Sequence, residues 1–241
     1  MFTRSSRFYD AIYSAFGKDY LAESEQIRAI IEQHIRSQER SLLDVGCGTG
    51  GHLAHLRDHY EVEGIDLDPG MLEIAAARLP GVRLHRGDMR GFDLGRRFGA
   101  VTCLFSSIGY VRTKDGLARA AVCLSKHLEP GGVLIVEPWI LPENWRDGTV
   151  HALHVDEPDL KISRMSVSRR EGDLSVIEFH YLMATRAGVE HFTERHELAL
   201  FDHREYVDAL AAAGLEVFHD PAGLPGRGRF IGIKPAGSPR P

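Results

Sequence analysis

The 241-residue chain has few cysteines and no long apolar run. Its three cysteines, Cys47, Cys103 and Cys123, are too few for a disulfide framework and suit a reducing compartment. No apolar stretch reaches the roughly 18 residues that a membrane-spanning helix needs. The first residues, Met1 to Arg4, lack the apolar segment of a secretory signal. We therefore expect a cytoplasmic protein with no membrane partner.

An excess of positive charge and the common metal motifs are also missing. The chain has 29 Lys and Arg residues against 34 Asp and Glu residues, a net charge of −5. This balance argues against nucleic acid as a partner, although it allows a local basic pocket. Neither CxxC nor HExxH occurs, so we expect no metal. The alternative is a metal held by His52, His55 and His59 on one predicted helical face, but exposed helix histidines are far more common.

Strand and helix patterns alternate up to residue 137, which is typical of a parallel sheet with helices on both faces. The apolar runs predict strands at 41–45, 62–67, 82–85, 98–105 and 133–137. The predicted helices cover 20–38, 52–59, a stretch that begins at Pro69, and 114–128. An aromatic helix at 7–16 precedes them, either as a lid over a ligand or as a helix packed on the sheet edge.

Residues 149–201 depart from this alternation. They form extended runs at 149–155, 160–169, 174–184 and 190–201, with glycine-containing turns at 170–173 and 186–188. These runs predict an antiparallel β insertion after the fifth strand. A helix at 203–213 and two strands, 215–218 and 229–233, follow, and we expect the two strands to pair antiparallel.

This order predicts an α/β fold with a Rossmann-like, mostly parallel sheet whose last strands are antiparallel. We expect residues 1–140 and 202–235 to form the ligand-binding domain, with the N-terminal helix as its lid. Residues 141–201 would then be an inserted antiparallel subdomain for substrate or dimer contacts. Residues 236–241 are expected to be a frayed tail.

The most informative stretch is the glycine-rich loop at 46–51, between a predicted strand and a predicted helix. Gly46, Gly48 and Gly51 match GxGxxG, and Asp66 lies about 20 residues further on, where an acid can bind ribose hydroxyls. Taken alone, this pattern fits a nicotinamide dinucleotide, S-adenosylmethionine (SAM) or a merely tight turn.

Two further acids favour SAM. Asp44 stands two residues before the first glycine, where it can organise the loop amides and reach a ligand ammonium through water. Asp88 follows the third strand and can accept a hydrogen bond from an adenine amino group, while Met89 packs on the ring. The chain also ends in a helix and a two-stranded hairpin rather than in a second βαβ half.

Residues 41–137 resemble a class I SAM-dependent methyltransferase in the stretch LLDVGCGTG at 42–50, in Asp66, in GDM at 87–89 and in LEPGG at 128–132. The resemblance and the chemistry of these side chains together predict ten cofactor-binding residues. They are Tyr9, Asp44, Gly46, Cys47, Gly48, Asp66, Leu67, Asp88, Met89 and Leu104.

Further blocks resemble the TDP-aminosugar N,N-dimethyltransferases of the desosamine and mycaminose type over nearly the whole chain. They are YD at 9–10, GKDY at 17–20, GDMR at 87–90, FSSIG at 105–109, EPW at 137–139, SRREG at 168–172 and GRG at 226–228. The family implies SAM as donor, a nucleotide-linked 3-amino-3,6-dideoxyhexose as acceptor, two successive methylations and a homodimer. That group often has Ala and Glu in place of Gly46 and Asp66. Tyr110 stands where one relative has His, and Phe2 lies near a tyrosine of that relative, so the accepted sugar can differ.

A sulfonium methyl group is strongly electrophilic, so we expect catalysis by orientation without an obligate general base. Tyr20 and Tyr110 are the candidates that orient the amine. The predicted substrate-binding residues are Tyr13, Tyr20, Tyr110, Trp139, Arg164, Ser166 and Arg227, with Arg227 on the diphosphate. Each has a structural alternative, such as aromatic packing or a solvated strand arginine.

The sequence therefore predicts an enzyme that dimethylates the amino group of a TDP-linked amino-dideoxyhexose in antibiotic biosynthesis. One alternative is a methyltransferase for another small amine or hydroxyl. An NAD-dependent oxidoreductase and a non-catalytic partner subunit with a SAM-binding fold are the alternatives from other classes.

Overall fold

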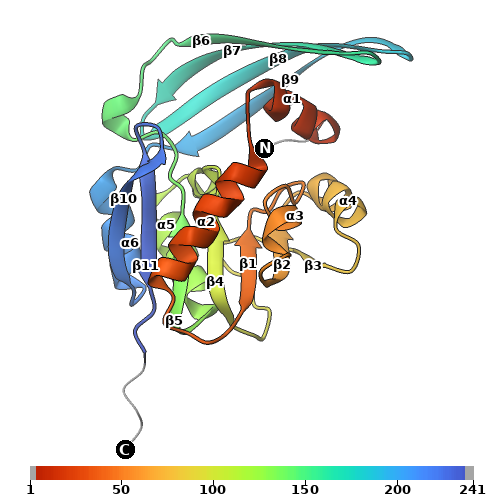
Figure 1. The fold of residues 1–241 in the computed structure, drawn as a ribbon. Coiled ribbons are helices and arrows are strands. Elements are labelled where there is room, and N and C mark those ends of the chain that lie inside the picture. Colours follow the sequence, from red (N-terminus) through yellow and green to blue (C-terminus); the bar gives the residue numbers. More distant parts are fainter. Residues whose placement is uncertain (1–3, 237–241) are drawn as a thin grey trace, which may run out of the picture.

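The computed structural model describes residues 4–236, which form two β-sheets. One sheet lies across the end of the strands of the other (Figure 1). Sheet A has seven strands in the order β10-β11-β5-β4-β1-β2-β3, and sheet B has four in the order β6-β7-β8-β9. Two expectations from the sequence lie outside the described residues. They concern Phe2 as a difference from a relative, and residues 237–241 as part of a frayed tail.

Sheet A confirms the predicted fold class. Strands β1 to β5 are parallel, whereas β11 runs antiparallel to both β5 and β10. The strands are β1 (Ser41–Val45), β2 (Glu61–Asp66), β3 (Arg83–Arg86), β4 (Phe98–Cys103), β5 (Leu128–Val136), β10 (Glu216–Leu224) and β11 (Gly228–Ile233). Every residue of β1, β4 and β11 is buried, as expected for strands covered on both faces.

Helices pack on both faces of sheet A and form two apolar cores. One core holds buried residues of α5 (Lys114–Lys126) and α6 (His203–Ala212). The other holds residues of α2 (Tyr20–His34) and α3 (Leu53–Leu56). Helix α4 (Pro69–Arg78) begins as the sequence predicts, because Asp68 accepts hydrogen bonds from the Gly70 and Met71 amides and Pro69 needs no partner for its nitrogen.

Several predicted boundaries were wrong. The helix expected at 52–59 is the single turn of α3, and α2 ends at His34 because Ile35 is extended, with ψ 131°. Strand β5 starts at Leu128 rather than at residue 133. The segment at 128–132, which the sequence predicted to end a helix, already belongs to sheet A, where Leu128 pairs with Phe98. Strand β4 stops at Cys103, because Phe105 and Ser106 take left-handed backbone angles, φ 49° and 65°.

Sheet B consists of β6 (Val150–Glu157), β7 (Leu160–Glu171), β8 (Leu174–Thr185) and β9 (Gly188–Ala199), all antiparallel. It lies across the end of the molecule at which β1 and β4 terminate (Figure 1). The N-terminal helix α1 (Tyr9–Ala15) packs on one of its faces, with Ile12 beside Tyr181 and Phe192 in a third apolar core. The sheet therefore covers the edge of sheet A where parallel α/β sheets bind ligands.

No helix among residues 4–236 is both long and apolar enough to cross a membrane. The same described residues contain no group of three or more His, Cys, Asp or Glu side chains placed to hold a metal ion.

Candidate active site

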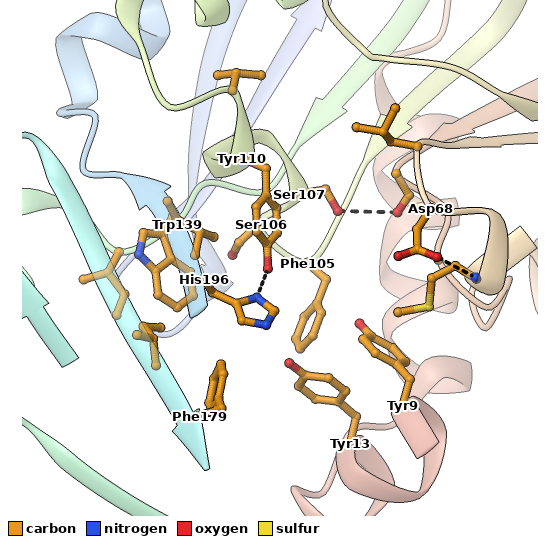
Figure 2. Close-up of a pocket in the computed structure, with 18 of the residues that line it drawn as sticks. Tyr9, Tyr13, Asp68, Phe105, Ser106, Ser107, Tyr110, Trp139, Phe179 and His196 are labelled. Carbon is orange, nitrogen blue, oxygen red and sulfur yellow. Dashed lines mark hydrogen bonds between the residues drawn. The ribbon is translucent and has the colours of Figure 1, made fainter. Parts of the chain in front are cut away.

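A cavity of about 560 Å³ lies between the loops at the carboxyl ends of sheet A and one face of sheet B. We call this the inner face of sheet B; it carries Arg164, Ser166, Ser168, Phe179 and His196. Helix α1 closes a third side (Figure 2). The volume is in the range of sites for small molecules and cofactors.

The glycine loop forms one end of the cavity, as its sequence indicated. The Gly46 and Cys47 amides donate to Ile65 O, at 2.8 and 3.1 Å, which ties the loop to the end of β2. Gly46 and Gly48 have φ of 75° and 55°, angles that glycine adopts without strain. A Cβ atom on Gly46 would lie 2.7 Å from Ser107 Cβ. Glycine at position 46 therefore allows the loop to pack closely against Ser107 at the cavity.

Two acids lie beside this loop, the partly buried Asp66 and the buried Asp44. Asp66 lines the cavity, and its carboxylate accepts hydrogen bonds from Gly48 N at 2.8 Å and Asp68 N at 2.9 Å. Asp44 is 2% exposed and accepts from Thr102 Oγ1 at 2.8 Å. Burial raises the pKa of both carboxyl groups. Each carboxylate oxygen has a second lone pair, so Asp66 can still accept hydrogen bonds from a ligand in the cavity.

Asp88, Met89 and Leu67 lie together on the cavity wall after β2 and β3. Arg90, which sequence reasoning did not assign, donates to both Asp88 oxygens, with Nη2 to Oδ2 at 2.5 Å. Its guanidinium holds the pKa of Asp88 below the usual range. A ligand that hydrogen-bonds to Asp88 must therefore share this carboxylate with Arg90.

A much smaller cavity adjoins the glycine loop, and Asp44, Cys47 and Leu104 line it. Tyr20 lines this small cavity and not the large one, with its ring under Gly51 and 5.0 Å from the His52 ring. The structure thus separates Tyr20 from Tyr110 and places it beside the predicted cofactor loop.

Lys18 also lines the small cavity, although sequence reasoning missed it as a site residue. Its Nζ lies 3.7 Å from the centre of the Phe105 ring and donates to Glu23 Oε2 at 2.5 Å. The same Glu23 oxygen lies 2.7 Å from His52 Nε2. The loop therefore has a cation and an imidazole beside its open backbone.

The other predicted substrate residues meet at the far end of the large cavity, and Tyr9 and Tyr13 line its α1 side. Arg227 lies with its Cζ 4.9 Å from the centre of the Trp139 ring and donates to Ser106 Oγ at 3.0 Å. Trp139 Nε1 donates to Ser175 Oγ at 2.7 Å. Burial lowers the pKa of Arg227, but a guanidinium remains charged at neutral pH.

Arg164 and Ser166 come from β7 and are 8% and 7% exposed. The Arg164 Cζ lies 4.7 Å from the centre of the Phe179 ring and 5.8 Å from that of Tyr13. Its Nη1 atom is buried and has no hydrogen-bond partner among the described residues. A buried guanidinium in this state is suited to an anionic or strongly accepting ligand group.

His196 and Phe179 also line the cavity, and sequence reasoning did not assign either of them to the site. The alternation along β7 predicted that Arg164 and Ser166 share a face of the sheet. Phe179 and His196 lie on that face because Ser166 pairs with Phe179 and Ile177 pairs with His196. No signal in the sequence defines that register, because each strand has polar residues on both faces.

The comparisons with known proteins decide the family. The family described as "Methyltransferase domain" matches residues 42–132. The dTDP-3-amino-3,6-dideoxy-alpha-D-glucopyranose N,N-dimethyltransferase of Streptomyces fradiae is 45% identical, over 95% of this chain and 90% of its own length. The chain belongs to the SAM-dependent aminosugar N,N-dimethyltransferases. Another member of this methyltransferase family, the dTDP-4-amino-2,3,4,6-tetradeoxy-D-glucose N,N-dimethyltransferase of Saccharopolyspora spinosa, is 41% identical, over 94% of this chain and 91% of its own length.

Solved methyltransferase structures have the same fold. DesVI of Streptomyces venezuelae superimposes with a TM-score of 0.90 at 42% identity, covering 97% of this chain and all of that one. SAM-bound CalS10, an amino pentose methyltransferase from Micromonospora echinaspora, gives a TM-score of 0.85 at 40% identity, covering 97% and 98%. SAM is therefore the cofactor of this methyltransferase. Its residues fit that group, because Gly46 and Gly48 line the cavity without side chains and Asp66 retains lone pairs beside them.

Proposed function

We propose that this methyltransferase transfers two methyl groups in succession from SAM to the 3-amino group of a dTDP-linked amino-dideoxyhexose in deoxysugar biosynthesis. The observation that carries the proposal is the single cavity that joins the glycine loop to two arginines, Arg164 and Arg227, in an acidic protein. The position of the amine is supported by the relative named for a 3-amino sugar, at 45% identity. A relative named for a 4-amino sugar follows at 41%.

The cofactor end would hold SAM through residues that already face the cavity. We assign the ribose hydroxyls to Asp66, the adenine to Asp88, Met89 and Leu67, and the methionine end to the smaller cavity beside Asp44. When bound, SAM supplies a methyl group on a positively charged sulfur. The Phe105 and Tyr13 rings, 5.0 Å apart and nearly perpendicular, border the space between the two ends of the cavity. Aromatic faces there stabilise positive charge and exclude water from the reacting atoms.

The acceptor end would hold the sugar nucleotide. Arg227 is placed to bind the diphosphate, because its half-buried guanidinium lines the cavity and, among the described residues, donates to the Ser106 hydroxyl. Arg164 and Ser166 offer further donors from sheet B. Binding the nucleotide rigidly brings the amine to the methyl group, and such orientation can lower the barrier by roughly 7–11 kcal/mol.

The proposal is tested with purified protein, SAM and the dTDP-3-amino-3,6-dideoxyglucose substrate, with the 4-amino isomer as the matched control. We expect mass spectrometry to show products that carry one and then two added methyl groups, formed faster from the 3-amino sugar. Equal or faster reaction of the 4-amino isomer would contradict the assigned position. Absence of product from both sugars would contradict the substrate class and leave another amine or hydroxyl as acceptor.

We also propose that residues 141–201 act as the substrate and dimer subdomain and that the enzyme is a homodimer. The face of sheet B turned away from the cavity exposes a row of apolar side chains: Val150, Met165, Val167 and Leu182. Met165 is 58% exposed, so Met165→Glu should convert a dimer into a monomer in light-scattering measurements. A monomeric wild-type protein would disprove this proposal.

A further inference from the structure

A tyrosine and a histidine form a hydrogen-bonded pair at the acceptor end of the cavity (Figure 2). Tyr110 lies on the short helix η2 (Ser107–Val111), and its hydroxyl is 2.6 Å from His196 Nδ1 on β9. His196 is 1% exposed, and the edge of its ring lies against the Phe179 ring at 5.1 Å. The pair therefore links a loop of sheet A to the inner face of sheet B, where the acceptor is proposed to bind.

The neighbours of His196 determine which ring nitrogen carries the proton. Its Nε2 faces Glu194, with Oε2 at 3.7 Å, a distance at which the carboxylate acts on the ring through its charge rather than through a short hydrogen bond. Three donors, Arg4 N, Ser5 N and Ser5 Oγ, lie 2.5–3.0 Å from the Glu194 oxygens, so this carboxylate acts only as an acceptor. The negative charge beside Nε2 favours the tautomer that places the N–H dipole there, with hydrogen on Nε2. The lone pair of Nδ1 then accepts the Tyr110 hydroxyl hydrogen.

The protonation states needed for this arrangement hold at neutral pH. Burial lowers the pKa of His196, and the positive charge of Arg164 on β7 lowers it further, although Glu194 opposes both effects. Burial, with the nearby Tyr13 hydroxyl, raises the pKa of Tyr110 well above its ordinary value. The imidazole is therefore neutral and the phenol keeps its hydrogen.

We propose that His196 is a positioning residue that holds the Tyr110 hydroxyl hydrogen away from the acceptor, so that the Tyr110 oxygen accepts an N–H bond of the amine. This inference rests on the proposed amine substrate. In each transfer the nitrogen lone pair forms the new N–C bond, the C–S bond breaks with its electron pair on sulfur, and the ammonium product loses one proton to water. The lone pair must be free at that moment. A hydroxyl that donated to it would block the attack, and His196 prevents this.

Two substitutions of His196 separate its hydrogen-bonding role from its packing role. His196→Asn places an amide oxygen near the former Nδ1 position and keeps an acceptor for Tyr110, whereas His196→Leu removes the acceptor and fills similar space. We expect His196→Leu to lower kcat roughly 10- to 100-fold, the scale of a misoriented reacting group, with nearly unchanged KM for the sugar nucleotide. His196→Asn should retain most of the wild-type kcat. His59→Leu, an exposed histidine outside both cavities, is the matched control.

The double variant Tyr110→Phe/His196→Leu tests whether His196 acts through Tyr110. We expect the same kcat as in Tyr110→Phe alone. An additional loss from His196→Leu in that background would overturn the inference, as would equal kcat values for the Asn and Leu variants of His196. The wild-type enzyme is assayed in parallel. A wild type that forms no methylated sugar would contradict the proposed function, and this result is distinct from a difference between the variants.

A measurement on the wild-type protein needs no substrate, and it uses a variant only to assign one signal. Nitrogen NMR of the SAH complex at neutral pH reports the tautomer of each histidine, and the His196→Asn spectrum identifies the His196 signal by its loss. We expect a neutral ring with hydrogen on Nε2. A proton on Nδ1 would overturn the inference whatever the acceptor is.

Discussion

Asp66 joins the ends of two neighbouring strands, because its carboxylate accepts from the amides of Gly48 and Asp68. Asp66 also lines the cavity, so we propose that one side chain both shapes the glycine loop and accepts hydrogen bonds from the ribose of SAM. We expect Asp66→Ala to weaken SAM binding by on the order of 2–4 kcal/mol, about 1–2 for each lost hydrogen bond. Calorimetry with SAH measures this, and Asp93→Ala, an exposed acid on another loop, serves as control. Unchanged affinity would remove Asp66 from the site.

Arg227 belongs to the acceptor end of the same cavity. We expect Arg227→Ala to raise the KM for the sugar nucleotide at least tenfold, since a hydrogen bond to a charged group is worth about 1.5–3 kcal/mol. The affinity for SAM should not change. Arg227→Lys keeps the charge but loses the planar pair of donors, and we expect it to recover only part of the loss. Weaker SAM binding with normal sugar binding would contradict the phosphate role.

Single residues differ in how far the sequence locates them. The positions of Asp44, Asp66 and Asp88 follow from their places at strand ends, because parallel strands bring all such ends to one edge. Tyr20 could not be placed in this way. Its ring lies under Gly51, and a Cβ on that glycine would be 2.6 Å from the Tyr20 ring. The contact joins α2 to a loop about 30 residues away, and no periodic pattern in either segment encodes it.

At the scale of elements, a small network of hydrogen bonds connects α1 to the glycine loop. Asp10 accepts from Thr49 Oγ1 at 2.8 Å and from Arg78 Nη2 at 2.5 Å, while Arg78 Nη1 also donates to Thr49 O at 2.9 Å. Three elements, α1, the loop and α4, therefore meet at the carboxylate of Asp10. The network therefore anchors the helix whose Tyr9 and Tyr13 line the cavity.

We expect Asp10→Asn to loosen α1, because an amide forms a weaker bond to the Arg78 guanidinium than a carboxylate does. Hydrogen exchange should accelerate in residues 9–15 and change little in sheet A, and the KM for SAM should rise. Asp19→Asn is the control, since the Asp19 side chain caps α2 by accepting from Ala22 N and lines neither cavity. Unaltered exchange in α1 would show that packing against sheet B holds the helix without the network.

The order of the helices and strands could be predicted from the periodicity of apolar residues, but the residues at which they begin and end could not. The alternating strands and helices and the four extended runs of sheet B follow from residue spacing. The end of β4 instead depends on Phe105 and Ser106, whose left-handed angles are held by tertiary contacts. Phe105 N donates to Glu137 Oε2 and Ser106 Oγ to Pro138 O, both at 2.8 Å. These partners lie more than 30 residues away, beyond the reach of a local pattern.

At the scale of the whole molecule, the cavity is shared between two sheets and a helix, so a ligand that fills it should stabilise the entire fold. We expect SAH at 100 times its Kd to add about 2.7 kcal/mol to the free energy of unfolding. For a chain of this size that corresponds to a rise in Tm of roughly 5–10 °C. Differential scanning fluorimetry measures the shift, with NAD as the control ligand. A shift with NAD and none with SAH would favour the oxidoreductase alternative.

Helix α1 touches both halves of this arrangement, since Asp10 contacts the cofactor loop and Ile12 lies in the core of sheet B. We therefore expect the binding of SAH and the binding of the sugar nucleotide to be coupled through this helix. If bound SAH increases the affinity for the sugar nucleotide by some factor, the bound sugar nucleotide must increase the affinity for SAH by the same factor. If that factor exceeds one, an enzyme that exchanges its spent cofactor between two proposed transfers would hold a monomethylated sugar most tightly while a cofactor is bound, and the sugar would dissociate most readily in the interval between cofactors.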